Sequence, residues 1–288
     1  KANIEANNIV FSGVGKTEEE ISFAITNHCL QINVESLSEL NRVNNIAGKI
    51  GNTQKVALRI NPDVDPNTHG KITTGKSENK FGISVDDAFN IFKNSGEYKN
   101  ITLDGVAFHI GSNINEIKPF EDSFKITNKL LQNLSDINVP IETIDVGGGV
   151  GIENVNFSYT DYSNLISKYF DTSQKQIIIE PGRSISANTG ILVSKILYIK
   201  KTETRKFIII DAGMNDWMRT ALYDAQHQIV PLEKKQSKDS VETIIVGPIC
   251  ETTDQFISIK EYSDVEEGEY LAILNTGAYG SSMSSNYN

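Results

Sequence analysis

The sequence contains little cysteine, no excess of positive charge and no apolar run long enough to span a bilayer. Its two cysteines, Cys29 and Cys250, cannot build a disulfide framework, which fits a reducing compartment. The 27 Lys and Arg residues are outnumbered by 37 Asp and Glu residues, for a formal net charge of -10. This balance argues against a nucleic-acid or anionic-membrane partner, because phosphate binding needs clustered basic side chains. No targeting segment is visible, so we expect the protein in the cytoplasm.

The first two-thirds of the chain alternates short apolar runs with amphipathic stretches. The strand-like runs cover residues 8–13, 31–36, 56–62, 103–111, 141–149 and 176–182. Helical spacing is visible in "TEEEISFAITN", in "SVDDAFNIFKN" and after "HIGSN". Runs that are apolar on both faces and alternate with helices predict a parallel sheet.

Several of these predicted strands end in polar or glycine residues, namely Ser36, Asn61, His109, Gly147 and Glu180. Functional groups at the C-terminal ends of successive parallel strands are typical of the catalytic rim of a TIM (β/α)8 barrel. A barrel needs eight strands and six are visible. A strand that ends at Lys1 would make seven.

After about Ala187 the sequence becomes rich in β-type runs without long helices between them, as in "ILVSKILYIKK" and "VETIIVGPIC". This pattern predicts a second, mainly antiparallel β domain. We therefore predict an α/β TIM barrel over residues 1–187 followed by a β domain over residues 188–288.

Four short segments carry candidate chemistry. The glycines of "DVGGGVG" can close around a phosphate through backbone N–H groups, or they form only a flexible turn. Glu180 in "IIIEPGRS" needs a cationic or protonated partner at the end of an apolar strand, and a salt bridge to a lysine would also serve. His109 in "FHIGS" is by itself more often a packing residue than a catalyst. Cys250, beside Glu251 in "GPICETTD", can equally be an inert thiol.

In their order along the chain, these motifs resemble those of the fold-type III pyridoxal-phosphate-dependent decarboxylases. The matching segments include "KAN", "FSGVGKTEEEI", "NVES", "LRINPDVD" and "TGKSENKFGI", and further on "FHIGSNI", "DVGGGVGI", "IEPGRSI", "DAGMNDWMRTALYDAQH", "GPICETTD" and "GAYGSSMSSNYN". The resemblance covers almost the whole chain. It implies pyridoxal 5′-phosphate as cofactor and no metal.

The resemblance also implies roles for individual residues. Lys1 would form the Schiff base with the cofactor, His109 would stack on its ring, and Glu180 would keep the ring nitrogen protonated. An electron-poor ring favours loss of CO2 from the bound amino acid. The phosphate would be held by the following residues: Ser112, Gly147, Gly148, Gly149, Gly182, Arg183 and Tyr279.

For the substrate, the resemblance implies meso-2,6-diaminopimelate, which would lose CO2 to give L-lysine. Its distal carboxylate would meet Arg183, Arg219 and Tyr223, with Tyr279 beside them, because the planar fork of arginine suits a carboxylate. Glu251 would accept the distal ammonium, and Cys250 would be a proton donor near the reacting carbon. In the family this "CET" segment enters the active site of the neighbouring subunit, which implies a homodimer with shared sites.

Three alternatives stay open at this point. The first is an ornithine/arginine- or carboxynorspermidine-type decarboxylase of the same fold, against which "WMRTALYDAQH" speaks. The second is a non-catalytic pyridoxal-phosphate carrier, a class without the second β domain. The third is an inactive homologue, which would be expected to have lost Lys1, Glu180 or Cys250.

The start of the chain raises a separate expectation. In the family several dozen residues separate the lysine motif from the segment that matches "FSGVGK", whereas here only "IEANNIV" lies between them. We therefore expect a gap shortly after Asn3, and the missing stretch would contain the eighth barrel strand.

Overall fold

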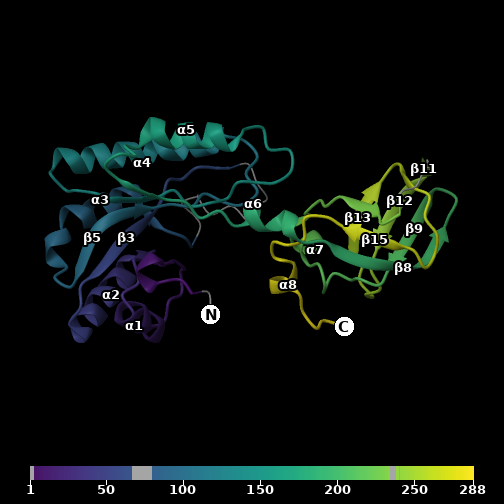
Figure 1. Ribbon diagram of the computed structural model, residues 1–288, viewed down its shortest axis with the longest axis horizontal. Coiled ribbons are helices and arrows are strands. Elements are labelled where there is room, and N and C mark those ends of the chain that lie inside the picture. The colour runs from purple at the N-terminus through teal and green to yellow at the C-terminus, as the bar shows by residue number, and fades with distance from the viewer. Residues whose placement is uncertain (1–2, 67–79, 234–237, 240) are drawn as a thin grey trace. The chain divides into compact units, whose positions relative to one another are not determined.

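The computed structural model describes residues 3–66, 80–233, 238–239 and 241–288 (Figure 1). The chain divides after Pro181 into two compact units. The sequence predicted this boundary slightly later, at about Ala187, where the β-rich pattern begins.

The first unit is built on a parallel sheet. Its strands are β1 (Val10–Phe11), β2 (Gln31–Val34), β3 (Gln54–Asn61), β5 (Ile101–Ala107), β6 (Thr143–Asp145) and β7 (Gln176–Ile178), paired in that order. The short β4 (Ile83–Ser84) pairs with β3 beside this path. Each of the six predicted runs therefore overlaps one strand, with β3 and β5 beginning two residues earlier than predicted, and the parallel pairing is confirmed.

Helices follow the strands as the sequence predicts. They are α1 (Glu18–Thr26), α2 (Leu37–Ile50), α3 (Val85–Lys93), α4 (Lys118–Asp136) and α5 (Tyr159–Tyr169). The Thr17 hydroxyl accepts from the N–H of Glu20 while the Glu20 carboxylate accepts from the N–H of Thr17, so a capping box fixes the start of α1. In Figure 1, α4 and α5 lie side by side along the sheet.

The core of the first unit lies between the sheet and these helices. Both faces of the strands are buried, as the continuous apolar runs require. Phe120 and Phe124 of α4 pack edge-to-face or tilted against aromatic rings of α5 and its flanks, including Tyr162 and Phe170. The helices are thereby fixed on the sheet, and the strand ends that carry the polar residues are held at one rim.

The second unit contains a mixed, mainly antiparallel sheet. Its order is β10 (Ile229–Pro231), β15 (Tyr270–Ile273), β8 (Leu192–Lys201), β9 (Arg205–Ile210), β12 (Glu242–Val246) and β13 (Gln255–Ile259). Among the strand pairs that the structure describes in this sheet, only β9–β12 is parallel. A separate pair joins β11 (Lys238–Asp239) to β14 (Tyr262–Ser263). Short helices α6 (Arg183–Ser186), α7 (Arg219–Tyr223) and α8 (Gly280–Met283) complete it. The predicted β character after residue 187 is confirmed.

Among the residues that the structure describes, no helix combines the length and the apolar character that crossing a membrane requires.

Candidate active site

Polar side chains from distant strands meet at one rim of the first unit. The Ser12 hydroxyl, just after β1, donates to Glu180 Oε1, just after β7, at 3.3 Å. Asn33 on β2 donates through Nδ2 to Ser12 Oγ at 3.0 Å and to Asp145 Oδ2 on β6 at 2.9 Å. Because β1 and β7 are the two ends of the strand order, these contacts require the sheet to curl until its edges approach each other. A cavity of about 130 Å³ lies at this rim. Its lining is Ser12, Asn33, Arg59, Ala107, Phe108, His109, Asp145 and Glu180.

Neighbouring backbone lies so close to the turn after β6 that its three positions, Gly147, Gly148 and Gly149, have no room for a side chain. A Cβ on Gly148 would lie 2.1 Å from the Glu180 carbonyl oxygen, and one on Gly149 would lie 2.2 Å from the Gly111 carbonyl oxygen. Gly147 has φ +67° and its Cβ would lie 2.4 Å from the Phe108 carbonyl oxygen. Only glycine allows the turn to sit this deep between the ends of β5 and β7, so a merely flexible turn does not describe it.

Two N–H groups of this turn are already used within the protein. Gly147 N–H donates to Asp145 Oδ1 at 3.0 Å, and Gly148 N–H donates to His109 Nδ1 at 3.2 Å. These two donors are therefore not available to a phosphate in this arrangement. The predicted phosphate contact of the turn stays a prediction, and the geometry leaves it to the N–H of Gly149.

His109 is a neutral imidazole. Because its Nδ1 accepts the Gly148 N–H, that nitrogen carries no proton and the neutral ring bears its hydrogen on Nε2. Burial, and then the positive charge of Arg59, lowers its pKa from 6.5 to about 4. A neutral, flat, half-buried imidazole is suited to lie against another ring without bringing in a charge.

Two carboxyl groups share the cavity. Asp145 is 1% exposed and its pKa is raised, first by burial and then by the charge of Glu180. Glu180 itself is exposed and accepts from Ser12. Among described residues it forms no ion pair with a lysine, so the simple salt bridge that the sequence allowed is not what holds it.

Arg59 projects from β3 into the same cavity and is fixed from two sides. Its Nη1 donates to Glu35 Oε1 at 2.8 Å, and its guanidinium lies 4.9 Å from the centre of the Phe81 ring. Glu35 Oε2 also accepts from the N–H of Gly82 at 3.3 Å. The arginine thus brings a fixed positive charge to the rim, near His109.

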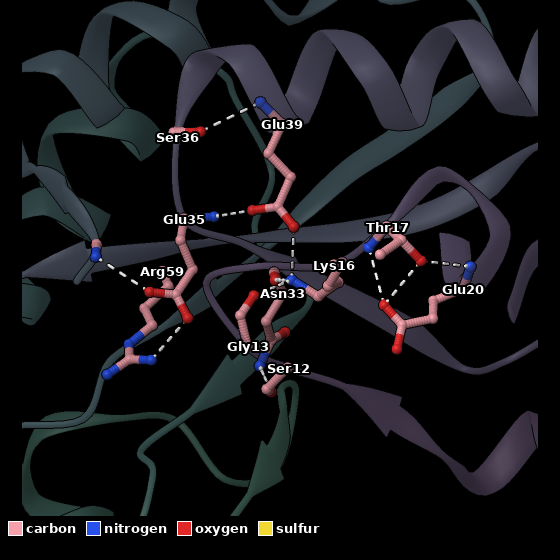
Figure 2. A network of polar contacts seen from close by, with 11 residues as sticks. Ser12, Gly13, Lys16, Thr17, Glu20, Asn33, Glu35, Ser36, Glu39 and Arg59 are labelled. Carbon is pink, nitrogen blue, oxygen red and sulfur yellow. Dashed lines mark hydrogen bonds and ion pairs between the residues drawn. The ribbon is translucent and has the colours of Figure 1, made fainter. Parts of the chain in front are cut away.

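A buried lysine organises the segments that carry these groups. Lys16 Nζ donates to the Gly13 carbonyl at 2.7 Å, to the Asn33 carbonyl at 2.6 Å and to Glu39 Oε1 at 2.6 Å (Figure 2). Glu39 Oε2 in turn accepts from the N–H of Glu35 at 2.7 Å. Figure 2 shows Lys16 at the centre of this network, between the turn after β1 and the start of α2.

The second unit holds two arginines close together. Arg183 and Arg219 are both buried, and their guanidinium carbons lie 4.9 and 4.7 Å from the centre of the Tyr279 ring. Arg219 also lies 5.1 Å from the Tyr223 ring. Tyr279 has φ +68°, an unusual conformation for a residue with a bulky side chain, and such strain is commonly found at functional sites.

Arg219 has no carboxylate partner among the residues that the structure describes. Its Nη1 makes only a 4.0 Å contact with Met283 Sδ, and its buried Nε has no hydrogen-bond acceptor there. Burial, and then the neighbouring charge of Arg183, lowers its pKa to about 10. Two adjacent buried cations repel each other, so an anion placed between them would remove an unfavourable interaction.

The segment with Cys250 and Glu251 is a loop between β12 and β13. Asp254 closes it, because Oδ2 accepts from the N–H of Ile249 at 2.8 Å and Oδ1 accepts from the N–H of Met214 at 2.7 Å. Cys250 is exposed. Glu251 accepts from the Thr253 hydroxyl at 3.2 Å and from the Tyr287 hydroxyl. The loop is therefore ordered without burying either of the two predicted site residues.

The predicted site residues fall into three sets. His109, the glycine turn and Glu180 meet at the rim of the first unit, and Ser112 lies in the turn that packs on Gly149. Those from Gly182 onward belong to the second unit. Lys1 lies outside the described residues, as does part of the "TGKSENKFGI" segment. The other two polar strand ends do not line the cavity: Ser36 caps α2, and Asn61 accepts from the N–H of Asp63.

Sequence reasoning missed Ser12, Asn33, Arg59 and Asp145 as site residues. Asp145 is the last residue of β6, so the rule that strand ends carry function applied to it directly. Arg59 lies within the motif "LRINPDVD" and Asn33 within "NVES", and both are inside strands, where the rule on strand ends does not apply.

Comparison with known proteins places this arrangement in a family. The profile of the family described as "Pyridoxal-dependent decarboxylase, pyridoxal binding domain" matches residues 1–187. The chain therefore belongs to the pyridoxal-dependent decarboxylases.

Relatives that align with the whole chain belong to one branch of this family, the diaminopimelate decarboxylases. The Aquifex aeolicus enzyme of that name is 42% identical over 292 residues, which takes in 100% of this chain and 69% of the relative. The Haemophilus influenzae enzyme is 43% identical and covers 99% of this chain and 69% of its own length. The crystal structure of the Helicobacter pylori enzyme complexed with L-lysine is 38% identical, with a TM-score of 0.92 over 100% of this chain and 72% of that one. The predicted barrel fold with a second β domain is confirmed by this likeness.

The aligned lengths bear on the start of the chain. An alignment of 292 residues that includes all 288 residues of this chain leaves no room for several dozen extra residues after Asn3. The expected gap is not found in this comparison. The role of Lys1 as the cofactor lysine depends on that gap and stays a prediction, which chemical labelling of the cofactor lysine would test.

Proposed function

We propose that the protein removes CO2 from meso-2,6-diaminopimelate to give L-lysine, with pyridoxal 5′-phosphate as cofactor. The likeness of the whole of this chain to enzymes named diaminopimelate decarboxylase supports the reaction. The observation that carries the choice of substrate is the buried Arg219, a cation without a carboxylate partner in the described part of the chain.

The rim of the first unit fits the ring of the cofactor. When bound, pyridoxal phosphate supplies an electron sink for the bond to the departing carboxylate. Glu180 would hold a proton at the ring nitrogen, because an exposed carboxylate with a single hydroxyl donor keeps acceptor capacity for a cation. His109 would support the face of the ring as a neutral imidazole, which its Nδ1 contact with Gly148 N–H maintains.

The second unit fits an anionic substrate group. Diaminopimelate keeps a carboxylate at the end that does not react, and a guanidinium can hold it through two parallel hydrogen bonds. Tyr223 and Tyr279 border the Arg219 guanidinium, so they limit its movement and shield it from water. A decarboxylase for ornithine has no distal carboxylate to bind and would leave this buried charge uncompensated.

The test is to replace Arg219 with alanine and to compare meso-diaminopimelate, lysine and ornithine as substrates. A charged hydrogen bond contributes about 1.5–3 kcal/mol, so kcat/KM for diaminopimelate should fall about 10- to 150-fold while cofactor binding is unchanged. Arg205→Ala is the matched control, because Arg205 is 53% exposed and pairs with Glu242 at the surface. It should leave kcat/KM within a factor of two.

Two results would count against the proposal. A wild-type protein that prefers ornithine or lysine would remove the diaminopimelate assignment and would leave the decarboxylase family unaffected. An Arg219→Ala variant with unchanged kcat/KM for diaminopimelate would show that this arginine does not meet the substrate.

Further roles follow the resemblance and are proposals of the same kind. We infer a homodimer in which Cys250 donates a proton near the reacting carbon of the neighbouring subunit and Glu251 accepts the distal ammonium. The exposure of Cys250 is compatible with a contact outside its own subunit. Sedimentation of the purified protein, and complementation between inactive Cys250→Ala and Glu180→Gln chains, would test the shared site. The cytoplasm is the proposed compartment.

A further inference from the structure

Asp145 occupies an unusual position beside the proposed cofactor-binding groups. It is the last residue of β6, is 1% exposed and lines the same cavity as Glu180. No basic side chain forms an ion pair with it among the described residues. A buried carboxyl group without a cation is costly to ionise. Its presence here must therefore be explained by its hydrogen bonds or by its proton.

The hydrogen bonds of Asp145 connect the parts of the site to one another. Oδ1 accepts from Gly147 N–H at 3.0 Å, at the start of the glycine turn. Oδ2 accepts from Asn33 Nδ2 at 2.9 Å, and Asn33 also donates to Ser12, whose hydroxyl donates to Glu180. One carboxyl group thus joins the glycine turn to the chain of contacts that ends on Glu180.

The orientation of Asn33 is itself fixed. Gln31 Nε2 donates to Asn33 Oδ1 at 2.7 Å, so the amide must present its Nδ2 hydrogens to Asp145 and Ser12. Gln31 and Asn33 are both buried. The donor at Asp145 Oδ2 therefore cannot turn away, which keeps the carboxyl group in one orientation.

We propose that Asp145 is a positioning residue of this site, which holds the glycine turn and Asn33 in place and gives up its own proton when a cation binds at Glu180. The proposal deepens the proposed function and rests on it only in taking Glu180 as the group that meets the cofactor ring.

The charges around the pair set its behaviour with pH. Burial, and then the charge of Glu180, raises the pKa of Asp145 to about 7. The other titratable or charged groups that face this cavity are His109, which is neutral, and Arg59 from β3, while Tyr162 of α5 interacts with Asp145 from the helix side. Protonated Asp145 adds no charge beside Glu180. A cation bound at Glu180 would favour ionisation of Asp145 and release its proton.

The first experiment follows the carboxyl carbon of Asp145 by NMR in the aspartate-labelled full chain without added cofactor. The signal should titrate near neutral pH in the wild type. In Glu180→Gln it should titrate at lower pH, because the neighbouring negative charge is gone. Asp104, also buried with a raised pKa but outside the cavity lining, is the internal reference that should not respond. Asp145→Asn identifies the signal.

The second experiment measures pyridoxal-phosphate affinity against pH in wild type and Asp145→Asn. Because ionised Asp145 adds a negative charge beside a cationic ring, wild-type affinity should rise with pH around neutrality by up to about tenfold per pH unit relative to the variant. This difference isolates Asp145, since the titration of the cofactor itself is common to both proteins.

The outcomes distinguish failure of the inference about Asp145 from failure of the proposed function. A wild-type Asp145 signal that titrates below pH 4, or one that Glu180→Gln leaves unmoved, would overturn the proposed link between the Asp145 proton and Glu180 whether or not cofactor binds. Parallel affinity curves for wild type and Asp145→Asn would do the same. A wild type that binds no pyridoxal phosphate would refute the proposed function, and the NMR titration would still decide the inference.

Discussion

Replacing Lys16 with methionine should remove the interaction that holds the rim of the first unit together. The ammonium side chain is 2% exposed and its partner Glu39 is 11% exposed, so both charges are shielded from water. Methionine keeps the approximate length of the chain but donates to none of the three acceptors at 2.6–2.7 Å. Glu39 would be left as a buried carboxylate without a counter-charge.

The size of the effect follows from that isolated charge. Breaking a buried ion pair by removing one partner costs about 3–5 kcal/mol. The double variant Lys16→Met/Glu39→Gln should be less destabilised than Lys16→Met alone, because the second change removes the stranded charge. An exposed pair such as Arg205–Glu242 should contribute less than about 1 kcal/mol, so Arg205→Ala is the surface control.

Urea unfolding followed by two probes would measure this. The single tryptophan, Trp217, is buried in the second unit and its fluorescence reports on that unit, whereas circular dichroism follows both units. The Lys16 variant should shift the circular-dichroism transition strongly and the fluorescence transition less. A variant within 1 kcal/mol of wild type, or a double variant less stable than Lys16→Met, would refute the reasoning.

Three further predictions concern single residues. Gly148→Ala should lower the free energy of unfolding by about 1–3 kcal/mol, because its Cβ would meet the Glu180 carbonyl, while Gly96→Ala, with nothing within 4 Å, should not; equal effects in a denaturation experiment would contradict the close approach. The free energy of unfolding should rise with pH between 4 and 6.5, because there the histidine binds a proton in the unfolded chain but not in the folded one, and His109→Asn should flatten this rise. An unchanged slope would mean that the ring is charged in the folded protein. Borohydride reduction of the loaded protein followed by peptide mapping tests the predicted role of Lys1: a label on Lys1 would establish it as the cofactor lysine, and a label elsewhere, or no label, would remove Lys1 from the site.

Much of the fold could be predicted because the strands and helices of the first unit are locally encoded. Each of the six apolar runs became a parallel strand, and Thr17 and Ser84 cap helices at their expected starts. The change to β structure after residue 187 was equally visible. The short strand β4 was not predicted, because two residues carry too little pattern.

The candidate site could be predicted only in part because its contacts cross the interior of the curled sheet. Asn33 on β2 and Asp145 on β6 are not neighbours in the strand order, yet they lie at hydrogen-bond distance. No local pattern indicates which side chains will face each other across such a sheet. His109 and Glu180 could be identified because they follow the ends of β5 and β7, whereas Arg59 and Asn33 sit one or two residues inside their strands.

The proton on His109 illustrates the same limit. Its sequence neighbours say nothing of a charge state, which here follows from the Gly148 N–H donor and the nearby Arg59. Arg59 lies on β3 and Gly148 lies in the turn after β6, so both are remote from His109 in the sequence.

The most direct test of the central claim is product formation from meso-2,6-diaminopimelate by the purified protein with added pyridoxal phosphate. We expect L-lysine and CO2 in equal amounts, with turnover reduced about 100-fold or more in Glu180→Gln, which corresponds to roughly 2.7 kcal/mol of transition-state stabilisation. A protein that binds the cofactor but forms no lysine from diaminopimelate, or a Glu180→Gln variant that turns over at the wild-type rate, would contradict the account.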